Sequence, residues 1–269
     1  LGENIHGRVM QNSGSGLSDV DPCMKHLDPL LLIPGLMCNE AVWDPVIPWL
    51  SSLVSCRVVD HGSANSLPLM AQQLLRDAPA RFAVAGHSMG ARVAVEVFRQ
   101  APERVSRVAL LDTGFTAKPL GAAGEDEAAK RYKLLALAQT EGVRAMAQAW
   151  VRGMVHPDRL QDTALIEEIL VMFERKSALH FEKQISALLS RPDASDVLRG
   201  IRAPALVLCG AQDSWAPIAQ HEAMQALIPE ARLAIIDNAG HMAPMERPEA
   251  VAEALLTWIS EDRLEDASA

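Results

Sequence analysis

Residues 82–98 read FAVAGHSMGARVAVEVF, and this stretch decides the fold. The apolar run 82–85 predicts a buried strand, and the residues after the glycines predict a helix. Between them lies Gly86-His87-Ser88-Met89-Gly90. The small residues let strand and helix pack closely, while Ser88 occupies a strained turn with its hydroxyl exposed. The pattern therefore predicts a nucleophile elbow, which needs a base, an acid and an oxyanion hole elsewhere in the chain.

The composition is that of a globular protein and excludes several classes of partner. The chain has 269 residues, of which 49% are hydrophobic, and its formal net charge is −9. We expect no membrane insertion, because no apolar run approaches the roughly 20 residues that a membrane helix needs. The negative charge and the scattered Lys and Arg disfavour nucleic acids and anionic membranes. A small molecule is the expected partner.

The cysteines and the first residues bear on cofactors and location. Four cysteines form no CxxC pair and show no metal-ligand spacing, so we expect free thiols and no metal site: Cys23, Cys38, Cys56 and Cys209. Residues 1–23 contain the linker-like NSGSG and no apolar signal region, which predicts a tag or disordered leader. With Met24 as the natural start, the protein is predicted to be cytoplasmic.

Short apolar runs alternate with stretches of helical periodicity along most of the chain. This alternation predicts an α/β fold with a mostly parallel, doubly wound sheet, whose catalytic loops meet at the carboxyl ends of the strands. The predicted strands are 30–33, 56–59, 82–85, 105–111, 205–209 and 233–236, and the helices between and after them include 67–77, 89–100 and 248–260.

The alternation stops after Asp112 and resumes at Ala205. Helical periodicity fills the gap, in the stretches 125–140, 141–155, 163–176 and 178–190. We therefore predict a helical cap, residues 113–204, inserted into a core made of residues 24–112 and 205–269. A cap over the strand ends would shield the site from water and shape the substrate pocket.

A serine hydroxyl needs a base within hydrogen-bond reach and a carboxylate that orients the base. His241, in the loop after the strand 233–236, is the candidate base. Asp213, which follows the strand 205–209, is the candidate acid, although it could merely cap the next helix. Asp112 is the alternative acid, although an aspartate there more often binds turn amides.

Two backbone amides are needed for an oxyanion hole, and other side chains are candidates for the pocket. Met89 follows the nucleophile at the start of a helix, and Leu36 lies in the loop after the first strand. Trp43, His87 and Trp215 are possible pocket residues, with packing in the core as the competing interpretation.

Taken together, residues 30–260 resemble the α/β-hydrolase superfamily. The resemblance rests on motifs in a fixed order: Pro34-Gly35, the elbow at Ser88, Leu110-Leu111-Asp112, Gly210-Ala211-Gln212-Asp213 and Gly240-His241. It implies the α/β-hydrolase fold, Ser88, Asp213 and His241 as the triad, and a cap that sets specificity. One departure is Pro34, where many relatives have histidine.

The predicted function is that of a carboxylesterase-like serine hydrolase. It would cleave small to medium carboxylic esters through an acyl-enzyme and without a cofactor. The same triad could hydrolyse a C–C bond, an enol-lactone or a small amide, because fold does not settle the reaction. A C–C hydrolase would need cations for substrate carboxylates, and Arg92, Arg152 and Arg175 are available. A ligand receptor on a hydrolase scaffold is the alternative of another class, and the intact triad argues against it.

Overall fold

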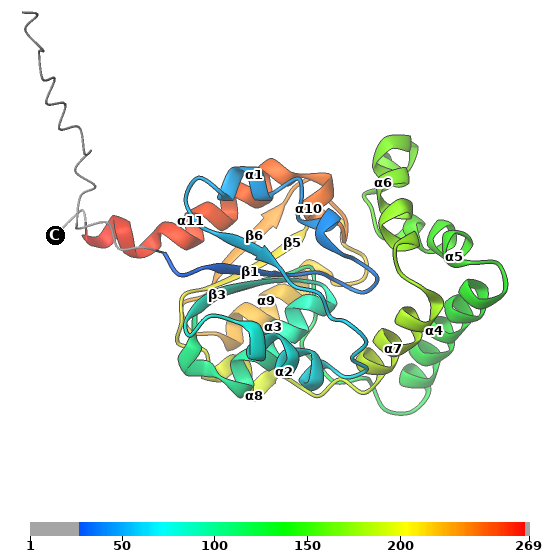
Figure 1. Cartoon of the computed structure of the whole chain (residues 1–269), viewed down its shortest axis with the longest axis horizontal. Helices are drawn as coiled ribbons and strands as arrows, with labels where there is room; N and C mark the ends of the chain where they lie inside the picture. The colour runs from blue at the N-terminus through cyan, green and yellow to red at the C-terminus, as the bar shows by residue number, and fades with distance from the viewer. Residues whose placement is uncertain (1–26, 267–269) are drawn as a thin grey trace, which may run out of the picture.

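Six strands form one parallel sheet in the computed structural model, which describes residues 27–266 (Figure 1). Their order in the sheet is β2-β1-β3-β4-β5-β6, and every neighbouring pair is parallel. The predicted sheet is confirmed. The strands are β1 (Leu30–Ile33), β2 (Cys56–Val58), β3 (Phe82–His87), β4 (Val105–Leu111), β5 (Ala205–Gly210) and β6 (Arg232–Ile236).

Helices cover both faces of the sheet, which explains why its inner strands are continuous apolar runs. In Figure 1, one layer lies above the sheet: α1 (Ile47–Leu50), α10 (Ala243–Glu246) and α11 (Pro248–Asp266). The other lies below: α2 (Leu67–Asp77), α3 (Met89–Gln100), α8 (Ser195–Gly200) and α9 (Ile218–Leu227). Strands β1, β3 and β5 are buried along their whole length as a result.

The strand order places a functional site. The chain runs outward from β1 to the edge strand β2 and then returns to the other side of β1 with β3. Ligands of open α/β sheets bind outside the carboxyl ends of the strands, where the winding reverses in this way. The loop after β1 and the turn after β3 therefore face the same crevice.

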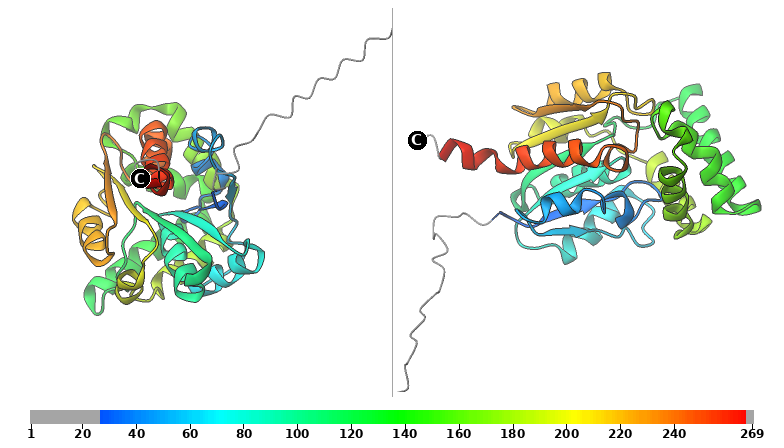
Figure 2. Two further views of the ribbon diagram at one scale, coloured as in Figure 1. Left: turned by 90° about the vertical axis from the view of Figure 1, so that its left-hand side faces the viewer. Right: turned by 90° about the horizontal axis from the view of Figure 1, so that it is seen from above.

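Four further helices stand together beyond one end of the sheet, between β4 and β5 in sequence (Figure 2). They are α4 (Ala122–Thr140), α5 (Val143–Trp150), α6 (Thr163–Glu174) and α7 (Ala178–Leu189). We call residues 113–204 the helical insertion. Its separation from the core as a cap domain stays a prediction.

Several predicted bounds need correction. The helix predicted for residues 141–155 is shorter, because Gly142 adopts a φ of 94° and α5 ends at Trp150, where a 3-10 turn (Val151–Gly153) follows. Strand β3 continues through Gly86 and His87, which pair with β4. The short helices α1 and α8 were not predicted. The expected leader, with Cys23 and Met24, lies outside the described residues.

Within residues 27–266, no helix has both the length and the apolar character needed to cross a bilayer.

The elbow brings α3 against the backbone of β1. A Cβ atom on Gly90 would lie 2.1 Å from the carbonyl oxygen of Ile33 and 2.6 Å from that of Pro34. A Cβ on Gly86 would lie 2.4 Å from the carbonyl carbon of Gly90. These neighbours are backbone atoms in the middle of the fold, so no side-chain rotation relieves the overlap.

We expect Gly90→Ala to lower the free energy of unfolding by about 2 to 3 kcal/mol or more, as overpacking does in a dense core. Gly200→Ala is the matched control, because a Cβ at Gly200 has no heavy atom within 4 Å. Alanine in that helical position should be neutral or stabilising by up to about 1 kcal/mol. Urea unfolding followed by circular dichroism measures both variants, and equal stabilities would refute this account of the elbow.

Candidate active site

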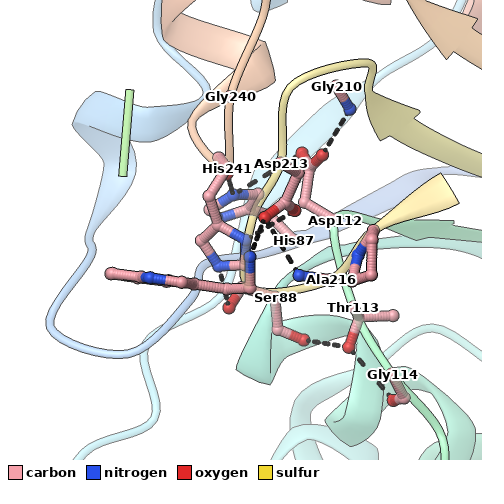
Figure 3. A network of polar contacts seen from close by, with 12 residues as sticks. His87, Ser88, Asp112, Thr113, Gly114, Gly210, Asp213, Ala216, Gly240 and His241 are labelled. Atoms are coloured by element: carbon pink, nitrogen blue, oxygen red, sulfur yellow. Dashed lines mark hydrogen bonds and ion pairs between the residues drawn. The ribbon is translucent and has the colours of Figure 1, made fainter. Parts of the chain in front are cut away.

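Ser88 occupies the turn between β3 and α3 in a strained conformation. Its φ is 55° and its ψ is −116°, values that residues with a side chain rarely adopt. Two hydrogen bonds hold the backbone of Ser88 in this conformation. The N–H of Ser88 donates to the oxygen of Leu111 at 2.8 Å, and the hydroxyl of Thr113 donates to the oxygen of Ser88 at 2.9 Å. The turn directs the Ser88 hydroxyl toward His241 (Figure 3).

Three side chains from three different loops form a continuous hydrogen-bonded row (Figure 3). Ser88 Oγ lies 2.8 Å from His241 Nε2, and His241 Nδ1 lies 2.8 Å from Asp213 Oδ2. Because the carboxylate accepts from Nδ1–H, Nε2 is left free to accept the serine proton. The structure thus brings together the predicted nucleophile, base and acid.

The carboxylate of Asp213 is buried and well partnered. Its Oδ1 accepts from the N–H groups of Trp215 and Ala216 at 2.9 and 3.0 Å. Burial by itself would raise the pKa of Asp213, but the pairing with His241 and these two amides outweigh it and hold the pKa below its usual value. Asp213 does not cap α9, whose N-cap is Pro217. The group therefore remains an anion that fixes the orientation of His241.

Asp112, the alternative acid, does not bind His241. Its Oδ1 accepts from the N–H of Gly210 at 2.9 Å. Its Oδ2 has no hydrogen-bond partner and lies 3.8 Å from His87 Nε2. Complete burial raises the pKa of Asp112 well above its usual value, and the nearby charge of Asp213 adds to the effect. Burial thus favours the protonated form of Asp112, beside the row and not within it.

His87 contacts the candidate base, His241. Its Nε2 donates to the backbone oxygen of His241 at 2.7 Å, and the two rings lie 5.5 Å apart. Burial, reinforced by the neighbouring His241, lowers the pKa of His87 to about 3, so the ring is uncharged. His87 lines the same cavity as Ser88, as predicted for a possible pocket residue.

The two tryptophans proposed for the pocket have different environments. Trp43 has no exposed surface and is absent from the residues that line the cavity, so the pocket prediction is wrong for Trp43, whose indole packs in the core. Trp215 does line the cavity. Its ring stacks on Trp150 at 5.5 Å and lies 4.9 Å from the ring of His241. The aromatic wall therefore begins directly at the base.

The loop after β1 reaches the same cavity. Leu36 and Met89 both line it next to Ser88, as an oxyanion hole built from their amides requires. The loop is fixed by His61, whose Nε2 donates to the oxygen of Pro34 at 2.8 Å, and by Gln184 of α7, whose Oε1 accepts from the N–H of Met37 at 2.8 Å. The role of the two amides stays a prediction.

Glu246 ties the loop of the base to the helical insertion, and sequence reasoning missed this role. Its Oε1 accepts from the N–H of Gly240 at 2.8 Å, and its Oε2 accepts from the N–H of His156 at 2.7 Å. The N–H of His241 itself donates to the oxygen of Met154 at 2.6 Å. The insertion therefore helps to position the base. The sequence contained a signal, since Glu246 closely follows the Gly240-His241 motif.

A cavity of about 560 Å³ lies between the strand ends and the helical insertion. One part of its wall is apolar and aromatic: Leu36, Met89, Leu134, Trp150, Met154, Phe173, Phe181 and Trp215. Cys38 also lines it, but burial raises the pKa of the thiol to about 12, so it carries no thiolate and is no rival nucleophile. The cavity is large enough for a small-molecule substrate.

The chain belongs to the alpha/beta hydrolase family, whose model matches residues 30–254. The resemblance inferred from the sequence motifs is thereby confirmed. Among curated proteins, the chain is similar to the pimeloyl-[acyl-carrier protein] methyl ester esterase of Aromatoleum aromaticum, with 28% identity over 240 residues that cover 82% of this chain and 93% of the relative. The enzyme of the same name from Nitrosomonas europaea is 25% identical and covers 82% of this chain and 91% of its own length.

Solved structures agree with this fold. A thermophilic esterase from Thermogutta terrifontis superposes with a TM-score of 0.74 at 24% identity, covering 87% of this chain and 89% of the other. The enol-lactonase from Burkholderia xenovorans gives a TM-score of 0.75 at 21% identity, covering 87% and 92%. At these identities the two likenesses concern the fold alone. The family and the curated relatives support the assignment of the chain as a hydrolase.

Proposed function

We propose that this chain is a carboxylesterase-like serine hydrolase that cleaves small to medium carboxylic esters through an acyl-enzyme on Ser88. One observation carries the proposal. The row Ser88, His241 and Asp213 is joined by two hydrogen bonds of 2.8 Å and opens on a cavity of about 560 Å³. A serine so paired with an oriented imidazole is an activated nucleophile.

The geometry supports a two-step reaction. Ser88 Oγ attacks the ester carbonyl as His241 Nε2 takes its proton, and the imidazolium returns this proton to the departing alcohol. Asp213 stabilises the imidazolium, because its carboxylate is buried and ionised beside Nδ1. The amides of Leu36 and Met89 would stabilise the oxyanion. Water, deprotonated by His241, then attacks the Ser88 ester, the acid is released, and the imidazolium returns the proton to Ser88 Oγ.

The neighbourhood of the base favours this cycle. His87 donates to the backbone of His241 and stays uncharged, so it places no second cation beside the imidazolium. The apolar wall provides surface for an acyl chain and keeps bulk water from the reacting carbonyl.

The curated relatives favour an ester over the alternative bonds. Their names describe esterases that cleave a methyl ester, so methyl esters of carboxylic acids are the first substrate class to test. The triad itself does not distinguish an ester from an enol-lactone, a small amide or a C–C bond. A ligand receptor would bind the same molecules without releasing products.

Pre-steady-state kinetics with p-nitrophenyl acetate test the proposal. We expect a burst of p-nitrophenol equal to the enzyme concentration, because acylation of Ser88 by an activated ester should outpace deacylation. Turnover of esters without turnover of p-nitroanilides or carboxylated dienones would support the ester class. Binding of all three without product release would favour a receptor and contradict the proposal.

We also propose that the protein works in the cytoplasm. The described cysteines Cys38, Cys56 and Cys209 are free, which suits a reducing compartment.

A further inference from the structure

One part of the cavity wall is strongly charged, although the cavity begins at an uncharged ester site. Four cations and two carboxylates line it there: Arg92, Lys130, Arg131, Arg191, Asp126 and Glu127. The cations exceed the carboxylates by two among these six side chains, and by one when Asp112, which also lines the cavity, is counted, whereas the whole chain carries a formal charge of −9. A positive wall in an acidic protein favours an anionic ligand.

The carboxylate of Glu127 is shared by two of these arginines. Arg191 binds it with both terminal nitrogens, at 2.7 and 2.8 Å, and Arg131 contacts Oε1 twice at 3.1 Å. Burial opposes ionisation, but the hydrogen bonds and charges of both arginines prevail and lower the pKa of Glu127 to about 2. Lys130 pairs with Asp126 at 2.7 Å. These contacts pair both carboxylates with the other three cations and leave Arg92 without a carboxylate partner among these six side chains.

Arg92 has no carboxylate partner among the described residues. Its Nη1 donates to the backbone oxygen of Thr116 at 3.1 Å, and Nε of Arg191 donates to the same oxygen at 3.2 Å. Two guanidinium groups thus meet at one carbonyl. Burial, with the charge of Arg191 next, lowers the pKa of Arg92 to about 9. Arg92 is only partly buried, and the charges of Glu127 and Asp193 partly offset that of Arg191, so its unused N–H donors remain available to an anion that enters the cavity.

The position of Arg92 relates it directly to the nucleophile. Ser88 is the N-cap of α3 and Arg92 lies four residues further along, so Arg92 follows the nucleophile by about one helical turn, or about 6 Å along the helix axis. Gly114 leaves room for the guanidinium, because a Cβ there would lie 3.0 Å from Nη2 of Arg92. Arg152 and Arg175 are absent from the cavity wall, and Arg175 pairs with Glu40.

We propose that Arg92 determines specificity by binding a carboxylate that the ester carries a few carbon atoms from its reacting carbonyl. The substrates would then be half-esters of short dicarboxylic acids. The planar guanidinium presents five N–H donors, of which one is used by Thr116, and it suits a carboxylate held by two parallel hydrogen bonds. This inference rests on the proposed esterase function.

The test compares two ester series of equal chain length. The first contains the monomethyl esters of succinic, glutaric and adipic acids, and the second the methyl esters of butyric, valeric and caproic acids. We expect the wild-type kcat/KM to favour the best half-ester over its neutral counterpart by about tenfold to a hundredfold, mainly through KM. Arg92→Gln should reduce that ratio about tenfold or more, and Arg92→Lys should retain part of it.

Arg152→Gln is the matched control, because it removes an exposed arginine of the helical insertion that does not line the cavity. It should keep the wild-type ratio. If Arg92→Gln does not fold, the wild-type ratio measured at rising NaCl concentration replaces it, and the ratio should fall as salt screens the cations. Glutarate should also inhibit hydrolysis of methyl valerate competitively.

The outcomes separate this inference from the function on which it rests. Hydrolysis of both series with equal kcat/KM would overturn the role of Arg92 and leave the esterase proposal intact. An unchanged ratio in Arg92→Gln would do the same. Hydrolysis of neither series would overturn the proposed function and the inference together.

Discussion

Replacing Ser88 with alanine is expected to lower kcat for methyl and p-nitrophenyl esters by about 10⁴-fold or more. The reason is that the acyl-enzyme needs the oxygen atom that lies 2.8 Å from His241 Nε2. Loss of the nucleophile in such a triad leaves only the rate that the oxyanion hole and binding supply. Binding should survive, because the cavity wall is otherwise intact.

Steady-state kinetics on Ser88→Ala measure this effect, with Ser52→Ala as the matched control at an exposed position. The control should keep the wild-type kcat. A folded Ser88→Ala protein that retains a tenth of the wild-type kcat would contradict the mechanism. Circular dichroism checks the fold, and Ser88→Gly adds a test of the strain: glycine tolerates a φ of 55°, so this variant should be equally inactive and no less stable.

Asp213→Asn is expected to lower kcat by roughly 10³- to 10⁴-fold, whereas Asp112→Asn should change it by less than about fivefold. A carboxamide in place of the Asp213 carboxylate would favour the wrong tautomer of His241, which then presents an N–H to Ser88. Asp112 makes no hydrogen bond to the base, and burial raises its pKa and so favours the uncharged form that asparagine resembles. Asparagine can still accept from the N–H of Gly210.

The same esters and assay serve for both aspartate variants. Equal losses in the two would mean that the buried carboxyls act as one unit. A larger loss in Asp112→Asn than in Asp213→Asn would reverse the assignment of the acid and revive the alternative that the sequence left open.

The core of the fold could be predicted from local sequence because its strands are buried on both faces. Strands β1 and β4 and helices α2 and α3 have the predicted bounds, since apolar runs, glycines and prolines mark their ends. The short helix α8 was not predicted, because six residues are too few to show helical periodicity. The end of α5 was not predicted, because the turn that follows it is in contact with a distant loop: Gly153 packs against Trp215.

Only the part of the candidate site that lies in sequence motifs could be predicted. Ser88, Asp213 and His241 each follow a strand, and parallel strands gather their ends at one edge. The contacts that hold them come from residues far apart in sequence, such as Gln184 against Met37 and Glu246 against His156. No local pattern encodes such pairs, and they depend on how the helical insertion meets the core.

Trp43 and Arg92 show the limit for specificity. Each was a candidate for the substrate pocket because of its side-chain chemistry, but only the structure shows where each one lies. Trp43 packs in the core, and Arg92 lines the cavity. Which of the arginines lacks a carboxylate partner is a property of the folded insertion and core together.

Mass spectrometry of the acid-quenched enzyme tests the central claim most directly. After a brief reaction with p-nitrophenyl acetate, we expect one acetyl group per chain, located on Ser88 in the peptide that contains the elbow, and decaying as acetate is released. Wild-type turnover with the acetyl group on another residue, or with no acylated enzyme while the burst is observed, would contradict a mechanism based on Ser88, His241 and Asp213.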